Sequence, residues 1–367
     1  MKKPKILFIM QLPPPIHGAS MVNLAITQSK EINNVFDLIV LPLNFVKKID
    51  DIGKASFLKV WYFIKIIFKL LKLLITKRFD LVYFTISPIG YAFYRDVIFV
   101  AVLKLFRKKI VFHLHGKGIK DKSEKSRLDM FLYKFVFKNE HVITLSKRLN
   151  KDVEHVYSKE PLVLNNGITY LDIKKEFSVK TDLTVFVYLS NLVISKGIKV
   201  FLEAIVLTKS KGHNFKTKII GNSADFSIEE IKDFVKQKEL SDYVAVLGPK
   251  YGDEKYEELS TSDVFVFPTQ NDCFPLSILE AMQMQLPVIS TNQGAIPDII
   301  SHNINGLIVM ENNVEDVSTA MIQYIDDKRL IVKHGANNLQ KFKENFTHEK
   351  FEENFIKVIN VILDENL

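Results

Sequence analysis

Two acidic residues in the second half of the chain, Asp272 and Glu280, have seven residues between them and flank a predicted junction of loop and helix. The β-branched and aromatic run Val264–Pro268 before them is typical of a buried strand, and Ser277–Gln285 is the predicted helix. The first turn of a helix presents free N–H groups that bind anions. The spacing therefore predicts an anion site at the carboxyl end of a strand, with a carboxylate on each side.

Two prolines mark the ends of this predicted helix. Pro275 fits the first helical position, where its missing N–H costs nothing, and Pro287 ends the helix before the next strand, Val288–Thr291. A purely structural interpretation of the acids is also compatible with this pattern. In that case Asp272 caps the helix, and Glu280 belongs to a solvated helix face.

The sequence around the two acids resembles a known signature. Asp272, seven residues and Glu280 are followed by Ala-Met, Pro-Val-Ile-Ser-Thr and a Gly-containing turn, a pattern that resembles the retaining glycosyltransferases of family 4, which have the GT-B architecture. The usual first acid is Glu, so Asp272 keeps the charge with one methylene less. The resemblance implies that Glu280 holds the two vicinal hydroxyls of a nucleotide ribose and that Asp272 contacts the donor sugar. It also implies that four residues between the two acids bind the donor: Phe274, Pro275, Leu276 and Ser277. The backbone N–H groups of Leu276 and Ser277 would hold its phosphate.

A second candidate anion contact is Lys196, in the segment Ser195-Lys196-Gly197 before a predicted helix, Ile198–Leu207. A lysine at a helix N-terminus opposes the helix dipole unless an anion occupies that end. In the family that the chain resembles, an Arg and a Lys here grip the donor diphosphate. Lys196 matches the Lys, whereas Asn191 stands at the Arg position, so one of the two cations is missing.

Histidines end a predicted strand in the first half, in His113-Leu114-His115-Gly116. Ligands of open α/β sheets bind at such carboxyl ends, and strand alternation puts both rings on one face. They are suited to hydrogen-bond a sugar hydroxyl or a phosphate, and a satisfied buried histidine is the alternative. The resemblance implies that His115 lies against the donor sugar.

The first turn of the chain, Gln11–Ser20, is rich in proline and has one glycine, Gly18. It lacks the Gly-x-Gly-x-x-Gly pattern of a dinucleotide site, which argues against a dehydrogenase. The resemblance implies that Gly18 lies in a loop beside donor and acceptor.

Two series of strands alternating with helices predict an α/β protein. Two such series imply two Rossmann-like doubly wound domains facing a cleft, at residues 1–168 and 180–345, which agrees with the GT-B architecture that the resemblance implies. In that architecture a C-terminal helix, about 346–367 here, crosses back to the first domain, and Gly167–Asp182 is the predicted linker. The predicted strands are Lys5–Met10, Asp37–Leu43, Asp80–Ile86, Ile110–His115, His141–Ser146 and Leu162–Leu164, then Thr184–Ser190, Lys216–Gly221, Val244–Gly248, Val264–Pro268, Val288–Thr291 and Gly306–Val309.

Composition narrows the classes of protein that fit. The 367 residues are 47% hydrophobic and 25% charged, as in globular proteins. The single cysteine, Cys273, excludes an internal disulfide and a zinc cluster, and it fits a reducing compartment. No Asp-x-Asp metal clamp and no signal peptide are evident. We therefore expect an enzyme without metal or other cofactor.

Charge divides the chain into a basic and an acidic half. Residues 1–168 contain 29 Lys and Arg against 13 Asp and Glu, a net +16, and the remainder has a net −8. Within the basic half, Phe57–Thr76 has about the length of a membrane span but is interrupted by lysines. Lys65, Lys69 and Lys72 share one helix face, and Trp61 is among the apolar residues that cover the rest. The helix fits an anionic membrane surface, or alternatively a cover for the first sheet with its lysines in water.

The sequence thus predicts a retaining GT-B glycosyltransferase of surface polysaccharide synthesis. It would move a sugar from a nucleotide-sugar, with UDP favoured, to a lipid-linked or otherwise anionic glycan acceptor at the cytoplasmic face of the membrane. Nucleic acid is not an expected partner, because no RRM or helix-turn-helix pattern surrounds the basic stretches. A nucleotide-sugar epimerase or phosphorylase on the same fold remains an alternative. So does a non-catalytic scaffold that binds membranes or polyanions.

Overall fold

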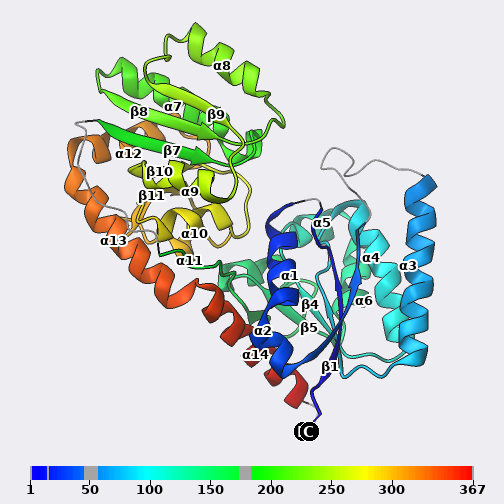
Figure 1. Cartoon of the computed structure of the whole chain (residues 1–367). Coiled ribbons are helices and arrows are strands. Elements are labelled where there is room, and N and C mark those ends of the chain that lie inside the picture. Colours follow the sequence, from blue (N-terminus) through cyan, green and yellow to red (C-terminus); the bar gives the residue numbers. More distant parts are fainter. Residues whose placement is uncertain (1, 15, 45–56, 173–182, 366–367) are drawn as a thin grey trace. The chain divides into compact units, whose positions relative to one another are not determined.

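The computed structural model describes residues 2–14, 16–44, 57–172 and 183–365, without the side chains of 57–60. The chain forms two compact units. Unit 1 consists of residues 1–166 and 349–367, and unit 2 consists of residues 167–348. In each unit, helices lie on both faces of a parallel sheet (Figure 1). This arrangement confirms the predicted α/β fold class with two doubly wound sheets.

The sheet of unit 1 has the strand order β2-β1-β3-β4-β5-β6, and all of its pairs are parallel. Its strands are β1 (Lys5–Met10), β2 (Asp37–Pro42), β3 (Leu81–Phe84), β4 (Ile110–His113), β5 (His141–Thr144) and β6 (Leu162–Val163). The helical elements are α1 (Gly18–Gln28), α2 (Lys30–Val35), α3 (Phe57–Thr76), α4 (Gly90–Leu105), α5 (Ile119–Lys125), α6 (Arg127–Phe137), the 3₁₀ segment η2 (Lys147–Asp152) and α14 (His348–Asp364).

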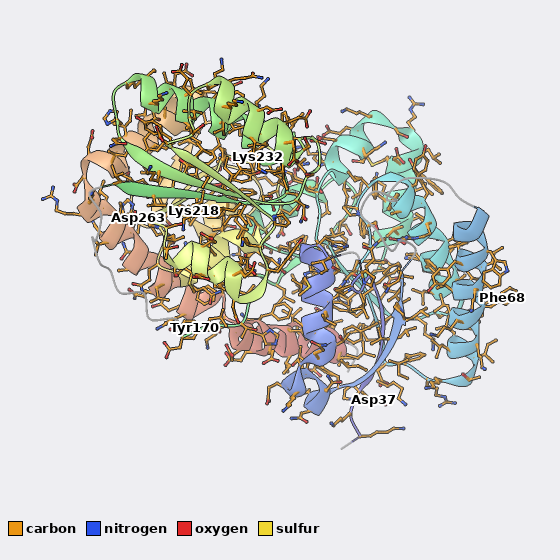
Figure 2. All side chains as sticks on the ribbon, turned by 45° about the horizontal axis from the view of Figure 1, so that its top comes forward. Asp37, Phe68, Tyr170, Lys218, Lys232 and Asp263 are labelled. Atoms are coloured by element: carbon orange, nitrogen blue, oxygen red, sulfur yellow. The ribbon has the colours of Figure 1, made fainter. Side chains whose placement is uncertain are left out.

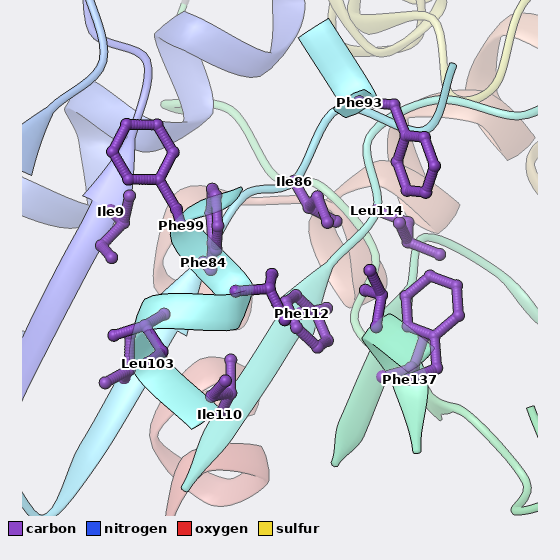
Figure 3. Packing of buried hydrophobic residues seen from close by; sticks show 14 of the residues in the cluster. Ile9, Phe84, Ile86, Phe93, Phe99, Leu103, Ile110, Phe112, Leu114 and Phe137 are labelled. Carbon is purple, nitrogen blue, oxygen red and sulfur yellow. The ribbon is translucent and has the colours of Figure 1, made fainter. Parts of the chain in front are cut away.

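Aromatic side chains dominate the core of unit 1 (Figure 3). Phe84 of β3 and Phe112 of β4 pack against Phe99 of α4 and Phe137 of α6, with ring centroids 5.6–6.4 Å apart. Strands covered on both faces are rich in apolar residues, which is why the sequence located them as near-continuous apolar runs. On the C-terminal helix α14, Phe355 lies 5.5 Å from the Tyr83 ring. The last helix of the chain is therefore part of unit 1.

Helix α3 has the predicted limits and two different faces. Ile66, Leu70 and Leu74, spaced four residues apart, are buried in the unit 1 core. On the outer side, Trp61 is 58% exposed. Phe68, which is labelled in Figure 2, is 67% exposed. The helix thus covers the sheet, and it also leaves large apolar side chains in contact with solvent.

Unit 2 has the strand order β12-β11-β10-β7-β8-β9, again parallel throughout. The strands are β7 (Thr184–Leu189), β8 (Phe215–Ile220), β9 (Val244–Gly248), β10 (Val264–Phe267), β11 (Val288–Thr291) and β12 (Gly306–Val309). The helical elements are η3 (Ile194–Lys196), α7 (Ile198–Ser210), α8 (Ile228–Gln237), α9 (Gly252–Ser260), α10 (Leu276–Gln283), α11 (Ile296–Ile299), α12 (Val314–Asp326) and α13 (Lys328–Asn345).

Several predicted boundaries differ from the structure. Pro275 is the residue before α10, with an extended backbone, rather than its first residue. The helix ends at Gln283, because Gln285 adopts a left-handed backbone (φ +55°) before Pro287. Residues 167–172 of the predicted linker belong to unit 2, where Ile168 bridges to Thr347 and the Leu171 N–H donates to Gln283. The rest of that linker lies outside the described residues.

Candidate active site

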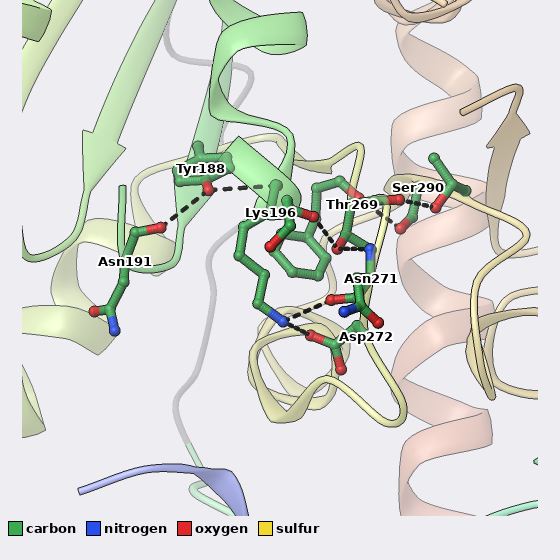
Figure 4. Close-up of polar contacts among 10 residues, drawn as sticks. Tyr188, Asn191, Lys196, Thr269, Asn271, Asp272 and Ser290 are labelled. Atoms are coloured by element: carbon green, nitrogen blue, oxygen red, sulfur yellow. Dashed lines mark hydrogen bonds and ion pairs between the residues drawn. The ribbon is translucent and has the colours of Figure 1, made fainter. Parts of the chain in front are cut away.

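Lys196 and Asp272 meet where β10 leads into α10 (Figure 4). The Lys196 Nζ lies 2.6 Å from Asp272 Oδ2 and donates a second hydrogen bond, of 2.9 Å, to the Asn271 carbonyl. The two side chains are 28% and 15% exposed, so the pair is accessible from one side. Because Asp272 pairs with Lys196 and α10 has no side-chain cap, the interpretation of Asp272 as a helix cap is wrong.

The turn that carries Lys196 is fastened to the end of β10. The Ser195 carbonyl accepts hydrogen bonds from the N–H groups of Gln270 and Asn271, at 2.9 and 3.2 Å. Gly197 has φ +82°, and a Cβ there would lie 2.1 Å from the Pro268 carbonyl oxygen. Only glycine fits this approach, and the approach brings the lysine to the carboxylate.

The N-terminus of α10 is positioned by the turn after β11. Gly294 packs so closely that a Cβ would lie 2.4 Å from the Asp272 carbonyl oxygen, and the Ala295 N–H donates to Cys273 at 2.7 Å. Leu276 and Ser277, in the first turn, are half-buried. The Phe274 side chain is buried instead and packs edge-on against Phe346 at 6.0 Å. Phe274 therefore shapes the loop through its side chain and can offer a ligand its backbone only.

Glu280 lies further along α10 and forms an ion pair that the sequence analysis missed. Its Oε1 is 2.6 Å from Nζ of Lys255 on α9, and both side chains are 18% exposed. Burial raises the pKa of Glu280, and the neighbouring Lys255 ammonium opposes that rise. A solvated helix face is therefore the wrong description of Glu280. Lys255 stands in an acidic stretch, Gly252–Glu258, where nothing local indicates a distant partner.

Asn191, at the position where the resembled family has Arg, is part of an amide network. Its Oδ1 accepts a hydrogen bond of 3.2 Å from Asn222 Nδ2, which also donates to the Tyr251 hydroxyl at 2.8 Å. Tyr188 donates to the Asn191 carbonyl at 3.4 Å. Position 191 thus supplies polar, uncharged groups. Of the two cations that the resembled family has here, only the lysine has a counterpart, which is Lys196.

In unit 1, His115 follows β4 and packs against His113, with ring centroids 4.1 Å apart and ring planes tilted by 46°. His113 is fully buried and shares a hydrogen bond with the Tyr83 hydroxyl through Nδ1. Burial, with a smaller contribution from His17, lowers the pKa of His115 to about 3. His115 is therefore neutral at physiological pH, and the two rings lie on one side of the strand as alternation predicts.

A cavity of about 170 Å³ lies beside His115, between α1, the end of β3 and the turn at Gly116. Gly116 allows the wall to close, because a Cβ there would lie 2.7 Å from the Pro88 ring. Gly18 is the exposed first residue of α1, and His17 before it caps the helix by accepting from the Ser20 N–H at 3.2 Å. Ala19, the next residue of α1, lines the cavity, whereas Gly18 does not.

The predicted membrane-side residues are exposed on α3. Trp61 is 58% exposed, and Lys65, Lys69 and Lys72 are all at the surface. Lys65 lies over the Trp61 ring, 5.5 Å from its centroid. Within the described part of the chain, no helix is both long and apolar enough to cross a membrane.

The predicted site residues thus form separate groups. In unit 2, Lys196 meets Asp272, while Glu280 pairs with Lys255. His115 belongs to unit 1. Among the described residues, no group of three or more His, Cys, Asp or Glu side chains is arranged to hold a metal ion.

Comparison with known proteins follows this division. Residues 171–347, essentially unit 2, match the family model "Glycosyl transferases group 1". This part of the chain is therefore similar to the group 1 glycosyl transferases. N-acetyl-alpha-D-glucosaminyl L-malate synthase of Bacillus anthracis is 26% identical over 256 residues, which are 66% of this chain and 65% of that protein. The capsular polysaccharide biosynthesis glycosyltransferase CapM of Staphylococcus aureus is 25% identical over 194 residues, 53% of this chain and 50% of CapM. The alignments therefore span less than two thirds of either relative.

Solved structures resemble the whole chain. HepE of Anabaena, crystallised in complex with UDP, has a TM-score of 0.75 at 15% identity, over 97% of this chain and 100% of HepE. The lipopolysaccharide outer core galactosyltransferase WaaB has a TM-score of 0.73 at 16% identity, over 99% and 100%. At these identities the likeness shows the fold, which is GT-B.

Proposed function

We propose that the protein is a retaining glycosyltransferase of family 4, which transfers a sugar from a UDP-sugar to a hydroxyl of a glycan acceptor in surface polysaccharide synthesis. The observation that carries this proposal is the arrangement at α10 in unit 2. A lysine–carboxylate pair stands beside a helix N-terminus without a side-chain cap, and a second carboxylate follows along the same helix. In this arrangement Lys196 and the helix N-terminus suit the donor phosphates, Asp272 suits the donor sugar, and Glu280 suits the ribose.

The donor roles follow from the chemistry of each group. Lys196 and the N–H groups of Leu276 and Ser277 bind the diphosphate and stabilise the charge that develops on it as the glycosidic bond breaks. Glu280 accepts hydrogen bonds from the two ribose hydroxyls, while the Lys255 ammonium favours its ionised form and so opposes the rise in pKa that burial causes. Asp272 orients the donor sugar. UDP is favoured as the nucleotide because HepE, which shares the fold, was crystallised with UDP and with UDP-glucose.

Transfer proceeds without a metal ion in this proposal, since Lys196 and the dipole of α10 meet the charge of the leaving diphosphate. His115 of unit 1 is neutral, and it acts as a hydrogen-bond partner of a sugar hydroxyl rather than as a cation. Retention of the anomeric configuration is assigned by resemblance to family 4, with the acceptor attacking from the face that the diphosphate leaves.

The acceptor is lipid-linked, and the enzyme works as a peripheral protein at the cytoplasmic face of an anionic membrane. The support is the surface of unit 1, where the lysine face of α3 lies beside exposed Trp61 and Phe68. Lysines attract anionic headgroups, and aromatic rings insert at the interface. Large apolar side chains on neighbouring helices are also exposed: Tyr91, Ile98 and Leu105 on α4, and Leu128 and Phe131 on α6.

The test is a panel of nucleotide-sugars added to the full chain, with binding read as a shift of the melting temperature. The donor that stabilises most is then incubated with lipid-linked acceptors, and the anomeric configuration of the product is read by NMR. A product of inverted configuration contradicts the family assignment. Isomerised sugar without acceptor supports an epimerase. Binding of vesicles with no donor hydrolysis and no transfer supports the non-catalytic scaffold.

A further inference from the structure

The cavity beside His115 has an unusual lining for the basic half of the chain, residues 1–168, whose net charge is +16. None of the nine described residues that surround it has a charged side chain. Ala19, Ile86 and Pro88 give it apolar walls, and Asn23, Thr85 and His115 give it polar ones. Its volume of about 170 Å³ suits a group of monosaccharide size.

Two of the polar residues have buried atoms without a partner among the described residues. Asn23, on α1, is 1% exposed; its Nδ2 donates to the Gln11 carbonyl and to Thr85 Oγ1, at 2.9 and 3.2 Å. These two bonds fix the amide, yet its Oδ1 has no hydrogen-bond partner, and neither has His115 Nε2. Unsatisfied buried polar atoms are rare in proteins and indicate a missing partner. A ligand hydroxyl suits both, because it donates and accepts.

The charges around the cavity do not favour an anion. His115 is faced by His113 on β4 and by His17 at the start of α1, and the pKa of each ring is lowered by burial. Tyr83, behind His113, has its pKa raised by burial and is also neutral. Asp96, a buried acid outside this lining, accepts from the N–H of the lining residue Ser87 at 2.9 Å and pairs with Arg95 at 2.6 Å. A carboxylate or phosphate placed in the cavity would lose its hydration without gaining a cation.

We infer that this cavity binds an uncharged, hydroxyl-bearing sugar ring, and that Asn23 and Thr85 are specificity-determining residues for it. The inference rests on the proposed function, whose sugar substrates it refines: the anionic part of a substrate stays outside the cavity, and the sugar unit that enters it is neutral. Asn23 Oδ1 and His115 Nε2 bind its hydroxyls, and Pro88 and Ile86 pack on its C–H face.

The test is saturation-transfer NMR on the full chain with saturating UDP. The probes are the methyl glycosides of glucose, galactose, mannose and N-acetylglucosamine, compared with the glycosides of glucuronate, galacturonate and mannuronate. At least one neutral glycoside gives a signal, which stays constant between about pH 5.5 and pH 8, and each uronide binds at least tenfold more weakly. Ala19→Leu fills the cavity and abolishes the signal, and Asn23→Leu weakens it at least tenfold. Gln28→Leu, on the exposed end of the same helix, leaves it unchanged.

Two sources could supply the ring, and a second measurement distinguishes them. If the ring is the donor's, Ala19→Leu weakens binding of the UDP-sugar and not of UDP. If it is the acceptor's, Ala19→Leu raises the acceptor KM and leaves hydrolysis of the UDP-sugar unchanged. The inference is overturned if a uronide binds as well as its neutral partner, if no neutral glycoside gives a signal with the wild type, or if Ala19→Leu binds like the wild type. UDP affinity is measured in every variant, and its absence in the wild type refutes the proposed function instead.

Discussion

Replacement of Lys255 by Met isolates the contribution of its ion pair to nucleotide binding. The Nζ–Oε1 distance of 2.6 Å corresponds to a gross attraction of about 6 kcal/mol at an effective dielectric constant of 20. Desolvation offsets much of this, and removing one member of a fully buried pair costs about 3–5 kcal/mol. Because both side chains are 18% exposed, we expect a loss of about 2 kcal/mol, or ~30-fold in affinity for UDP.

The loss should depend on pH. Burial raises the pKa of Glu280 and the Lys255 ammonium lowers it, so the Lys255→Met change raises this pKa further. A protonated Glu280 cannot accept from both ribose hydroxyls, so affinity is lost as pH falls through the raised pKa and recovers at high pH. Calorimetric titration with UDP over a series of pH values should therefore show a variant that approaches the wild-type affinity as pH rises and is weakest at the acid end.

Two control variants make this measurement decisive. Lys255→Arg keeps the cation and should retain UDP affinity across the pH range. Lys218→Met removes a lysine of equal exposure from its pair with Glu258 (2.9 Å; 18% and 25% exposed) and should not change UDP affinity. A loss in Lys255→Met that is the same at every pH would mean that the lysine acts by packing alone. Unchanged affinity would remove Glu280 from the ribose site.

Three further predictions concern the proposed function. Glu280→Ala should weaken UDP binding by at least ~100-fold in calorimetry, because two charge-assisted hydrogen bonds of about 1.5–3 kcal/mol each are lost. Asp272→Glu restores the usual family residue within reach of Lys196 and should keep measurable transfer. Turnover should persist in excess EDTA; inactivation that Mn²⁺ or Mg²⁺ reverses would contradict metal independence. Replacing Lys65, Lys69 and Lys72 by Glu should lower co-sedimentation with anionic vesicles, since each lysine contributes about 1 kcal/mol there, and should spare hydrolysis of the UDP-sugar.

The fold was predictable from sequence because both sheets are parallel and buried. Strands such as Lys5–Met10 and Val288–Thr291 appear as short runs rich in apolar and β-branched residues, and the structure has them at the predicted residues. Boundaries next to polar turns were less accurate. β4 was expected to reach His115 and ends at His113, although the next residue, Leu114, still donates its N–H to the Ile143 carbonyl at 2.9 Å. The alternation of residues along a strand does not show at which residue the strand ends or which side chain lies beside a cavity.

The candidate site was only partly predictable. Asp272, Glu280 and Lys196 lie in local patterns that the sequence displays, but the partners of Glu280 and Asn191 come from other elements. Lys255 is 25 residues away from Glu280 along the chain, and its partner depends on how α9 packs. Asn23 had a weak signal, since it is a polar residue inside the apolar run Met21–Ile26. A buried amide in such a run needs hydrogen-bond partners, and that need identifies it as a candidate site residue.

The two halves of the chain differ in how they meet negative charge. The acidic half, with a net −8, offers a donor diphosphate Lys196 and the N–H groups of α10, which act at contact distance in a partly buried place. Such contacts are weakly screened by salt. The basic half carries its net +16 with lysines such as Lys65 and Lys69 at the surface of unit 1, where a Debye length of about 8 Å at physiological ionic strength limits their reach. Nucleotide binding should therefore be nearly independent of salt, whereas attachment to an anionic surface should fall steeply. The uncharged cavity beside His115 then recognises the sugar ring itself. The surface lysines of the basic half attract an anionic substrate but do not distinguish one sugar ring from another.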